Sequence, residues 1–226
     1  MPIYKTKNED FFKKWSPEMA YVLGFFTADG NMIKNKRGAH FVSFYNTDRE
    51  LLEKVKFNLK SDLKISARKI NPKYPNHKQS YVLQIGSKEM FNDLLCLGMT
   101  PNKSLTIRMP VVPKKILSHF LRGYFDGDGH VSVSTYQKRD RKNKSTNIIT
   151  GFTSGSKKFL KGLWKVLRKQ GIIEGGTLYH TLGYHLCFST HDSLRLYNFM
   201  YQKEKDLYLE RKKSIFEHYF EKILGA

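Results

Sequence analysis

The sequence has few cysteines, few acidic residues and no long apolar run. Its two cysteines, Cys96 and Cys187, are too few for a disulfide framework, so we expect a reducing, intracellular setting. Charge or glycine interrupts every apolar stretch well before the roughly 18 residues of a membrane span. The opening MPIYKTKNEDFFKKW lacks the apolar core of a signal peptide. The sequence therefore predicts neither a secreted nor a membrane-spanning protein.

The shortage of acid leaves a large positive charge. Among the 226 residues, 40 Lys and Arg face 20 Asp and Glu, which gives a formal net charge of +20. An excess of this size predicts a polyanionic partner. The cations recur through predicted strands and hairpins instead of gathering on one amphipathic helix, which favours nucleic acid over a membrane surface. Scattered charge that serves only solubility is the alternative.

The chain contains an internal repeat. AYVLGFFTADG (20–30) resembles HFLRGYFDGDG (119–129), and a basic hairpin follows each. FYNTDRELLEKV (44–55) then matches FTSGSKKFLKGLWKV (152–166), which aligns Asn46 with Ser154. SYVLQIGSKEMF (80–91) similarly matches GYHLCFSTHDSL (183–194). The chain therefore divides into two related halves.

Each half is predicted to fold as helix, hairpin, helix, hairpin, helix, in an α+β class. Apolar and polar residues alternate at 63–68, 80–85, 131–136 and 184–189. This alternation predicts antiparallel sheets with one packed face and one solvated face. We expect an N-terminal extension at 1–15, a first half at 16–99, a proline-containing linker at 100–115 and a second half at 116–226.

The helix that precedes each hairpin contains unfavourable residues. Ser16 is a candidate N-cap of the first helix, and Gly30 is a candidate glycine at its C-terminal end. Within this helix Gly24 costs about 1 kcal/mol relative to Ala. Asp29 adds negative charge where the helix dipole is already negative. The repeat of both features in the second half indicates a compensating function.

Close packing between the two repeated helices explains their glycines. Gly24 and Ala28 are four positions apart, as are Gly123 and Gly127, so each helix has a small-residue stripe that allows close packing against the other helix. Such packing would bring Asp29 together with its counterpart Asp128. Paired carboxylates repel unless one is protonated or a cation binds. We therefore predict a Mg²⁺ site that also uses the carbonyl oxygens of Ala28 and Gly127.

The two nine-residue motifs VLGFFTADG (22–30) and LRGYFDGDG (121–129) resemble those of the LAGLIDADG homing endonucleases. The resemblance implies a monomer with two pseudo-symmetric αββαββα halves, motif helices at their interface and sheets that form a saddle over double-stranded DNA. It also implies that Asp29 and Asp128 bind the catalytic metal. At the sixth motif position Thr27 replaces the usual acid, which Asp126 retains.

The resemblance extends to further catalytic residues. GMTPNKSLT (98–106) is similar to the stretch that holds a catalytic lysine, here Lys103. LYLERKKSIF (207–216) offers Arg211, Lys212 and Lys213, of which we choose Lys212, with Lys213 close behind. Asn46 and Ser154 resemble the polar residues that order water around the scissile phosphate. Candidate DNA contacts are Lys34, Lys36, Arg37, Lys64, Arg68, Gln84, Ser132, Ser134, Tyr136, Lys138, Arg139, Arg141, His180 and His185.

The implied function is site-specific cleavage of both DNA strands at a long asymmetric target, with short 3′ overhangs, as in intron homing. We expect Mg²⁺ as cofactor, Mn²⁺ as a substitute, and Ca²⁺ binding without cleavage. A non-cleaving intron maturase with an RNA partner, or a DNA-binding regulator, is the alternative, but the retained acidic pair favours the nuclease. We expect no intein, because no splicing segments flank the repeat, and composition does not separate a bacterial, phage or organellar source.

Overall fold

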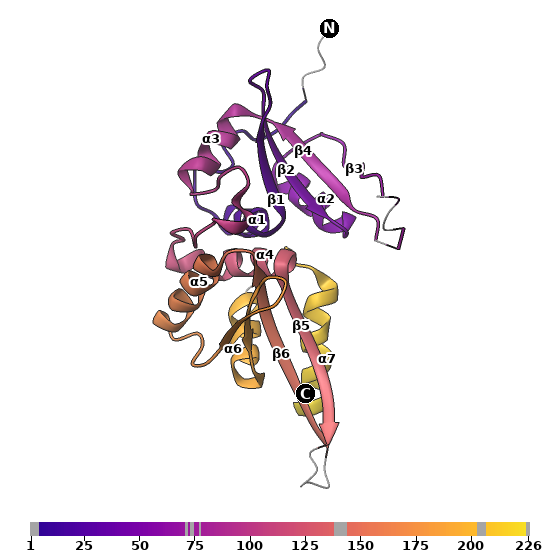
Figure 1. Cartoon of the computed structure of the whole chain (residues 1–226), viewed down its shortest axis with the longest axis vertical. Helices are drawn as coiled ribbons and strands as arrows, with labels where there is room; N and C mark the ends of the chain where they lie inside the picture. The colour runs from indigo at the N-terminus through magenta and orange to yellow at the C-terminus, as the bar shows by residue number, and fades with distance from the viewer. Residues whose placement is uncertain are drawn as a thin grey trace. The chain divides into compact units, whose positions relative to one another are not determined.

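The computed structural model describes residues 5–70, 72, 75–76, 78–137, 144–202 and 207–224 (Figure 1). The predicted α+β class with two antiparallel sheets is confirmed. The first sheet has the strand order β1-β2-β4-β3, and the second has the equivalent order β5-β6-β8-β7. Among the described residues, no helix is long and apolar enough to cross a membrane.

The elements follow the predicted repeat. The first series is α1 (Pro17–Asp29), β1 (Gly30–Lys34), β2 (His40–Asn46), α2 (Arg49–Asn58), β3 (Ser66–Ala67), β4 (Tyr81–Gly86), α3 (Lys88–Cys96) and the 3-10 turn η1 (Lys103–Leu105). The second is η2 (Lys114–Ile116), α4 (Leu117–Asp128), β5 (Gly129–Gln137), β6 (Lys144–Ser154), α5 (Lys157–Lys169), β7 (Thr177–His180), β8 (Tyr184–Phe188), α6 (Thr190–Tyr201) and α7 (Glu210–Leu224).

The packing units differ from the sequence halves. The first unit comprises residues 1–103 and 110–127, and the second comprises 104–109 and 128–226. Most of α4, which opens the second repeat, therefore packs inside the first unit. The segment 104–109 in turn belongs to the second unit, where Ser156 Oγ donates to the carbonyl oxygen of the buried Ile107 (2.7 Å). Part of the predicted linker is thus anchored by packing.

The close approach of α1 and α4 within the first unit requires glycine. A Cβ at Gly24 would overlap the backbone carbonyl of Phe120, and a Cβ at Gly123 would overlap that of Tyr21. Backbone cannot move aside as a flexible side chain can. The two glycines thus allow the tight packing of these helices that the sequence predicts.

Each sheet packs one face into the core of its own unit. In the first sheet, Val42, Phe44 and Leu83 are buried on the covered face. In the second sheet, Phe152 and Phe188 are buried in the same way. Side chains of alternate residues point to the opposite face, which we call the open face. The strands of both sheets therefore present rows of side chains away from the core.

Two details of the strand prediction are wrong. In the first half, strand β3 of the second hairpin contains only Ser66 and Ala67. Ala67 is exposed, although the alternation at 63–68 placed it on the packed face. Val133, also predicted to be packed, is 41% exposed in the long ribbon that β5 and β6 form (Figure 1). Alternation gives the side of a strand on which a residue lies, whereas burial depends on whether another element covers that side.

Candidate active site

The first candidate site is built where α1 ends and β1 begins. Ser16 Oγ caps α1 by accepting from the backbone N–H of Met19 (3.1 Å), and Gly30 ends the helix, as expected. Gly30 adopts an extended backbone, with φ −89° and ψ 154°, and not the left-handed conformation typical of a C-terminal glycine. Glycine is needed because a Cβ would overlap Phe26. The helix thus passes directly into a strand and leaves Asp29, which is half-buried, at the junction.

Asn46, at the end of β2, orients this carboxylate. Its Nδ2 donates to Asp29 Oδ2 (3.1 Å), while its Oδ1 accepts from the backbone N–H of Asp48 (2.8 Å). Asp48 is the N-cap of α2. The amide is therefore fixed at both ends, so the start of α2 determines the orientation of the acid.

Lys103 completes the first site. Its ammonium donates to the carbonyl oxygen of Gly30 (2.7 Å) and lies 5.4 Å from the centre of the Phe26 ring. The side chain is only 4% exposed. A lysine this deeply buried needs hydrogen-bond acceptors to offset the loss of hydration. Its place beside the residue that follows Asp29 supplies one and brings positive charge next to the acid.

The second unit repeats this arrangement. Lys212 is 5% exposed, and its ammonium donates to the carbonyl oxygen of Gly129 (2.6 Å), the residue after Asp128. Ser154 ends β6 and accepts from the backbone N–H of Ser156 (3.1 Å), the N-cap of α5. Asn46 likewise accepts from the backbone N–H of the residue two positions later, Asp48. The second site therefore matches the first in lysine, glycine carbonyl and strand-end polar residue.

The neighbours of Lys212 lie in different surroundings. Lys213 pairs with Glu217 (2.9 Å) and lies 4.7 Å from the centre of the Tyr208 ring. The hydrogen bond to Glu217 raises the pKa of Lys213. Arg211 is exposed. Of the three candidates in this segment, only Lys212 lies buried against the residue that follows a motif aspartate.

The residue at the sixth motif position is buried and hydrogen-bonded in both halves. Asp126 is fully buried and accepts a hydrogen bond from Tyr21 Oη (2.6 Å) on α1. The Arg122 guanidinium lies 5.4 Å from the centre of the same tyrosine ring. Thr27 is also buried and donates to the carbonyl oxygen of Leu23 (2.7 Å) in its own helix. Neither residue needs a metal role to explain its position.

The end of each motif helix carries oxygen donors of the kind that a divalent cation such as Mg²⁺ prefers. Asp29, Asp128 and the carbonyls of Ala28 and Gly127 are hard oxygen donors at helix ends, and each of these four residues is half-buried. A Cβ at Gly127 would overlap that of Ala28 and lie 3.3 Å from Asp29 Oδ2, so glycine leaves room for both residues. Across the described part of the chain, no three His, Cys, Asp or Glu side chains group to hold a metal. Mg²⁺ typically binds through one or two carboxylates with water and phosphate.

Comparison with known sequences decides the family. The family model described as a LAGLIDADG-like domain matches residues 16–95 and 115–198, which is more than half of the chain. The chain belongs to the LAGLIDADG family. A curated relative, the probable translation initiation factor IF-2 of Thermococcus kodakarensis, is 30% identical over 180 residues. That match covers 76% of this chain but only 13% of the relative.

Solved LAGLIDADG structures share the fold. The homing endonuclease I-SmaMI bound to cleaved DNA has a TM-score of 0.59 and 15% identity, with 90% of this chain and 87% of that chain covered. I-WcaI bound to its DNA recognition sequence has a TM-score of 0.59 and 15% identity, with 91% and 90% covered. Another I-SmaMI structure, with uncleaved DNA and calcium ions, has a TM-score of 0.53 and 16% identity, with 85% and 86% covered. Both named proteins are homing endonucleases in complex with DNA.

In the first unit of this LAGLIDADG protein, the candidate DNA contacts are exposed. Lys34, Lys36 and Arg37 lie at the tip of the β1–β2 hairpin, and Lys64 lies just before β3. On the open face, Gln84 Nε2 donates to Ser43 Oγ (3.2 Å). The Arg68 guanidinium lies 5.0 Å from the centre of the Tyr45 ring. The structure thus places Gln84 within the sheet and the cations at a hairpin tip and beside β3.

In the second unit the candidate DNA contacts lie on both sides of the sheet. Ser132, Ser134 and Tyr136 are exposed on the open side of β5, and His185 lies on the open face of β8. His180 pairs with Tyr184 and therefore lies on the other side of the sheet, at the exposed end of β7. The remaining candidates, Lys138, Arg139 and Arg141, lie outside the described residues.

A polar cluster on the open face of the second unit was missed by the sequence analysis. His130 Nε2 lies 3.8 Å from Cys187 Sγ, and Tyr179 Oη lies 3.6 Å from the same sulfur. Burial, His185 and Lys212 lower the pKa of His130. Gly151 makes room for the imidazole, because a Cβ there would overlap it. Strand register brings these residues together, and register is not visible in the separate strand sequences.

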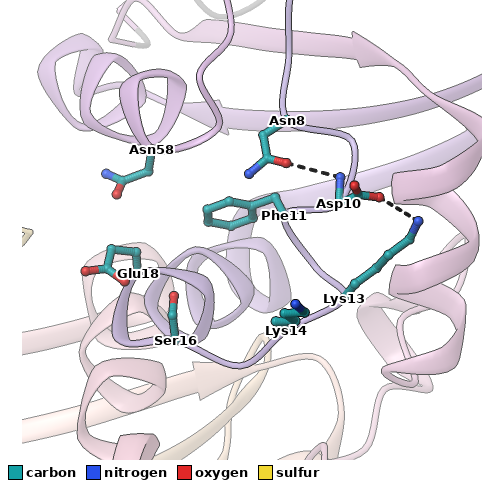
Figure 2. A pocket seen from close by; sticks show the side chains of 8 residues that line it. All are labelled: Asn8, Asp10, Phe11, Lys13, Lys14, Ser16, Glu18 and Asn58. Carbon is teal, nitrogen blue, oxygen red and sulfur yellow. Dashed lines mark hydrogen bonds and ion pairs between the residues drawn. The ribbon is translucent and has the colours of Figure 1, made fainter.

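A surface pocket of about 610 Å³ lies elsewhere in the first unit (Figure 2). Lys13, one of its lining residues, pairs with Asp10 (2.6 Å), and Asn8 Oδ1 accepts from the backbone N–H of Asp10 (3.2 Å). Neither Asp29 nor Lys103 is among its lining residues. The pocket is lined by two lysines, Lys13 and Lys14, and by two acids, Asp10 and Glu18, so its charges balance and do not favour a phosphate.

Proposed function

We propose that this LAGLIDADG protein is a site-specific endonuclease that hydrolyses both strands of double-stranded DNA. One observation carries the proposal. In each unit a buried lysine, Lys103 or Lys212, donates to the glycine carbonyl that directly follows a motif aspartate. Two equivalent sites, each with an acid and a lysine, suit two equivalent reactions, one on each strand.

Each residue has a distinct part in the proposed reaction. Asp29 and Asp128, with the carbonyls of Ala28 and Gly127, would hold Mg²⁺. Bound divalent cations would activate water and offset charge on the leaving oxygen. The ammonium groups of Lys103 and Lys212 would stabilise the negative charge that develops on the scissile phosphate. Asn46 would hold the Asp29 carboxylate in position, and Ser154 would orient water in the second site.

The open faces would bind the DNA. A two-stranded ribbon such as β5–β6 fits the major groove, where every base pair has a distinct pattern of donors and acceptors. Asn31, Ser43 and Gln84 form a row in the first sheet, whereas His130, Gly151 and Cys187 form the equivalent row in the second. Because these rows differ in chemistry, we propose an asymmetric target. Cleavage would leave short 3′ overhangs.

The experiment that tests this function is cleavage of a randomised duplex library, followed by sequencing of the ends. With Mg²⁺ or Mn²⁺, the ends should recur at one long asymmetric site. With Ca²⁺, the protein should bind DNA without cutting, in line with the relative whose DNA is uncleaved in calcium. Tight binding without cuts in any divalent metal would instead support a non-cleaving binder.

Asp29→Asn and Asp128→Asn provide the matched controls. Each substitution removes one metal-binding charge at nearly constant size, so double-strand cleavage should fall by at least about 10³-fold. Binding should change little, because a carboxylate without metal repels phosphate. If both variants lose binding as well as cleavage, the aspartates are structural and the proposed roles are wrong.

A further inference from the structure

Helix α5 carries a concentrated positive charge, contrary to the expectation that no single helix gathers the cations. Its sequence KKFLKGLWKVLRK contains no acid. All six of its cations are exposed: Lys157, Lys158, Lys161, Lys165, Arg168 and Lys169. The equivalent helix α2 is balanced by ion pairs, such as Lys54 with Glu50 (3.3 Å) and Arg49 with Glu53 (3.4 Å). The excess is therefore specific to the second half.

The apolar side of α5 is fully used by the fold. Phe159, Leu160, Leu163 and Leu167 are completely buried. Trp164 of α5 and Phe188 of the covered face both border Gly176, so α5 packs on the covered face of the second sheet. With its apolar side in the core, α5 cannot insert into a membrane. Lys157, at the start of the helix, lies 5.7 Å from the centre of the Tyr184 ring on β8, and the other cations are exposed on the outer side of the helix, away from the open face.

Four of the cations form a regular row. Lys157, Lys161, Lys165 and Lys169 are spaced four residues apart, so the row is about 18 Å long. One strand of duplex DNA carries about five phosphates over such a length along its axis. Lysine is a flexible point charge that binds phosphate without reading a base. The row therefore matches a sugar-phosphate backbone of any sequence.

The charges of this row are not neutralised by the protein. No carboxylate of the described residues forms an ion pair with Lys157, Lys161, Lys165 or Lys169. The acid that follows the helix, Glu174, is already paired with Arg195 (2.6 Å). That ion pair lowers the pKa of Glu174. Like charges on neighbouring turns destabilise a helix, which indicates that the row serves an anionic partner.

We propose that the lysine row of α5 binds a second double-stranded DNA segment, independently of sequence, so that the protein bridges two duplexes. One duplex cannot occupy both surfaces, because DNA stays straight over about 50 nm and would have to reverse direction around a single unit. Duplex DNA is the polyanion that surrounds any target of the proposed nuclease. The inference rests on DNA binding at the open face but not on cleavage.

The test measures whether the protein, while bound to one DNA duplex, also holds a second duplex. A short random-sequence duplex is fixed to beads, the full-length protein is added, and retention of a second, labelled random duplex is measured. The test variant replaces Lys157, Lys161, Lys165 and Lys169 by Gln. The control variant removes equal charge elsewhere, with Lys14, Lys54, Lys56 and Lys88 changed to Gln. Thermal unfolding should show both variants folded, because the replaced side chains are exposed or half-buried.

The wild type and the control should capture the labelled duplex, whereas the α5 variant should capture about tenfold less and still bind the first duplex. The salt slope of capture should fall by about 3 to 4 when four phosphate contacts are lost. The proposal is overturned if the wild type binds only one duplex, or if both variants lose capture equally. It is also overturned if a hairpin RNA, or vesicles of phosphatidylcholine and phosphatidylserine, bind the row in preference to DNA.

Discussion

The two halves of the molecule share the arrangement around the motif aspartates but differ in the open faces of their sheets and in the equivalent helices α2 and α5. Around the motif aspartates, Lys103 and Lys212 each bind a glycine carbonyl, and Asn46 and Ser154 each accept from the N-cap of the next helix. The open faces and the equivalent helices α2 and α5 do not match in this way. Residues that carry the proposed chemistry are thus repeated, whereas residues that face solvent have diverged.

The difference follows from what each set of residues must do. Both strands of a duplex have the same phosphodiester chemistry, so both sites need an acid and a cation. Base sequence differs along the DNA, so the surfaces that read it can differ between the halves. Repetition indicates common chemistry, and divergence indicates recognition. Substitutions in the shared helix contact, in the lysines and in the strand-end residues test how far this separation holds.

Replacing either helix glycine should have the largest effect. Gly24→Ala and Gly123→Ala would each place a Cβ against backbone of the opposite helix, so each should lower the free energy of unfolding by about 3 kcal/mol. Denaturant unfolding measures this loss. Gly86→Ala is the matched control, because its Cβ would lie 3.7 Å from the nearest atom, a ring carbon of Phe41. Equal stability of all three variants would contradict the described helix contact.

Removing the buried lysine charges should have the next largest effect. Lys103→Met and Lys212→Met keep the side-chain length and should each slow cleavage by about 10²-fold, or about 2.7 kcal/mol in the barrier. If each lysine serves its own site, a supercoiled plasmid with the target will accumulate nicked circles. Lys213→Met, which removes the ion pair to Glu217 and the contact with the Tyr208 ring but no contact to a motif glycine, should leave the rate within about twofold. A normal rate for both buried variants would remove the lysines from the reaction.

Exchanging the strand-end residues should have a moderate effect. Asn46→Ser would keep an acceptor for the Asp48 N–H but lose the hydrogen bond to Asp29, so cleavage should fall by about tenfold, or about 1.4 kcal/mol. Single-turnover rates at saturating metal measure this change. Ser154→Asn serves as the reciprocal variant and should fold normally. If Asn46→Ser cleaves as fast as the wild type, the contact to Asp29 does not position the acid.

Sequence predicted the repeated parts of this molecule well, because they depend on local signals. Ser16 as an N-cap and the glycine stripes of the motif helices follow from helix geometry, and the structure has them where the sequence places them. The element order follows from alternation and periodicity. The buried contacts of Lys103 and Lys212 agree with positions chosen by resemblance, whereas their roles in catalysis stay predictions.

The features that sequence missed depend on contacts between distant segments. The cluster of His130, Tyr179 and Cys187 comes from three strands, so it exists only once the register is fixed. The side of the sheet on which His180 lies also depends on register. The basic row of α5 could have been found, since its cations recur with helical spacing in one short segment. Its meaning still required the knowledge that the other side of α5 is buried.

The smallest expected effect concerns the pH dependence of stability. Burial, with His185 and Lys212 nearby, holds the pKa of His130 below its ordinary value of about 6.5. Below that pH the unfolded chain binds a proton that the folded protein resists, so His130 lowers stability as the pH falls. His130→Asn places asparagine, the residue at the equivalent first-half position Asn31, at this site and should make unfolding less sensitive to acid as the pH falls through and below about 6.5.

Chemical unfolding of wild type and His130→Asn at several pH values measures this difference. Well above pH 6.5 the pH slopes of the two proteins should coincide, because the imidazole is then neutral in both the folded and the unfolded state. Gly151→Ser sharpens the test by copying the first-half residue Ser43, since its side chain would displace the His130 ring toward water. NMR titration should then show the His130 pKa rising toward its ordinary value. A pKa unchanged by Gly151→Ser would mean that the space at Gly151 does not hold the imidazole in its buried position.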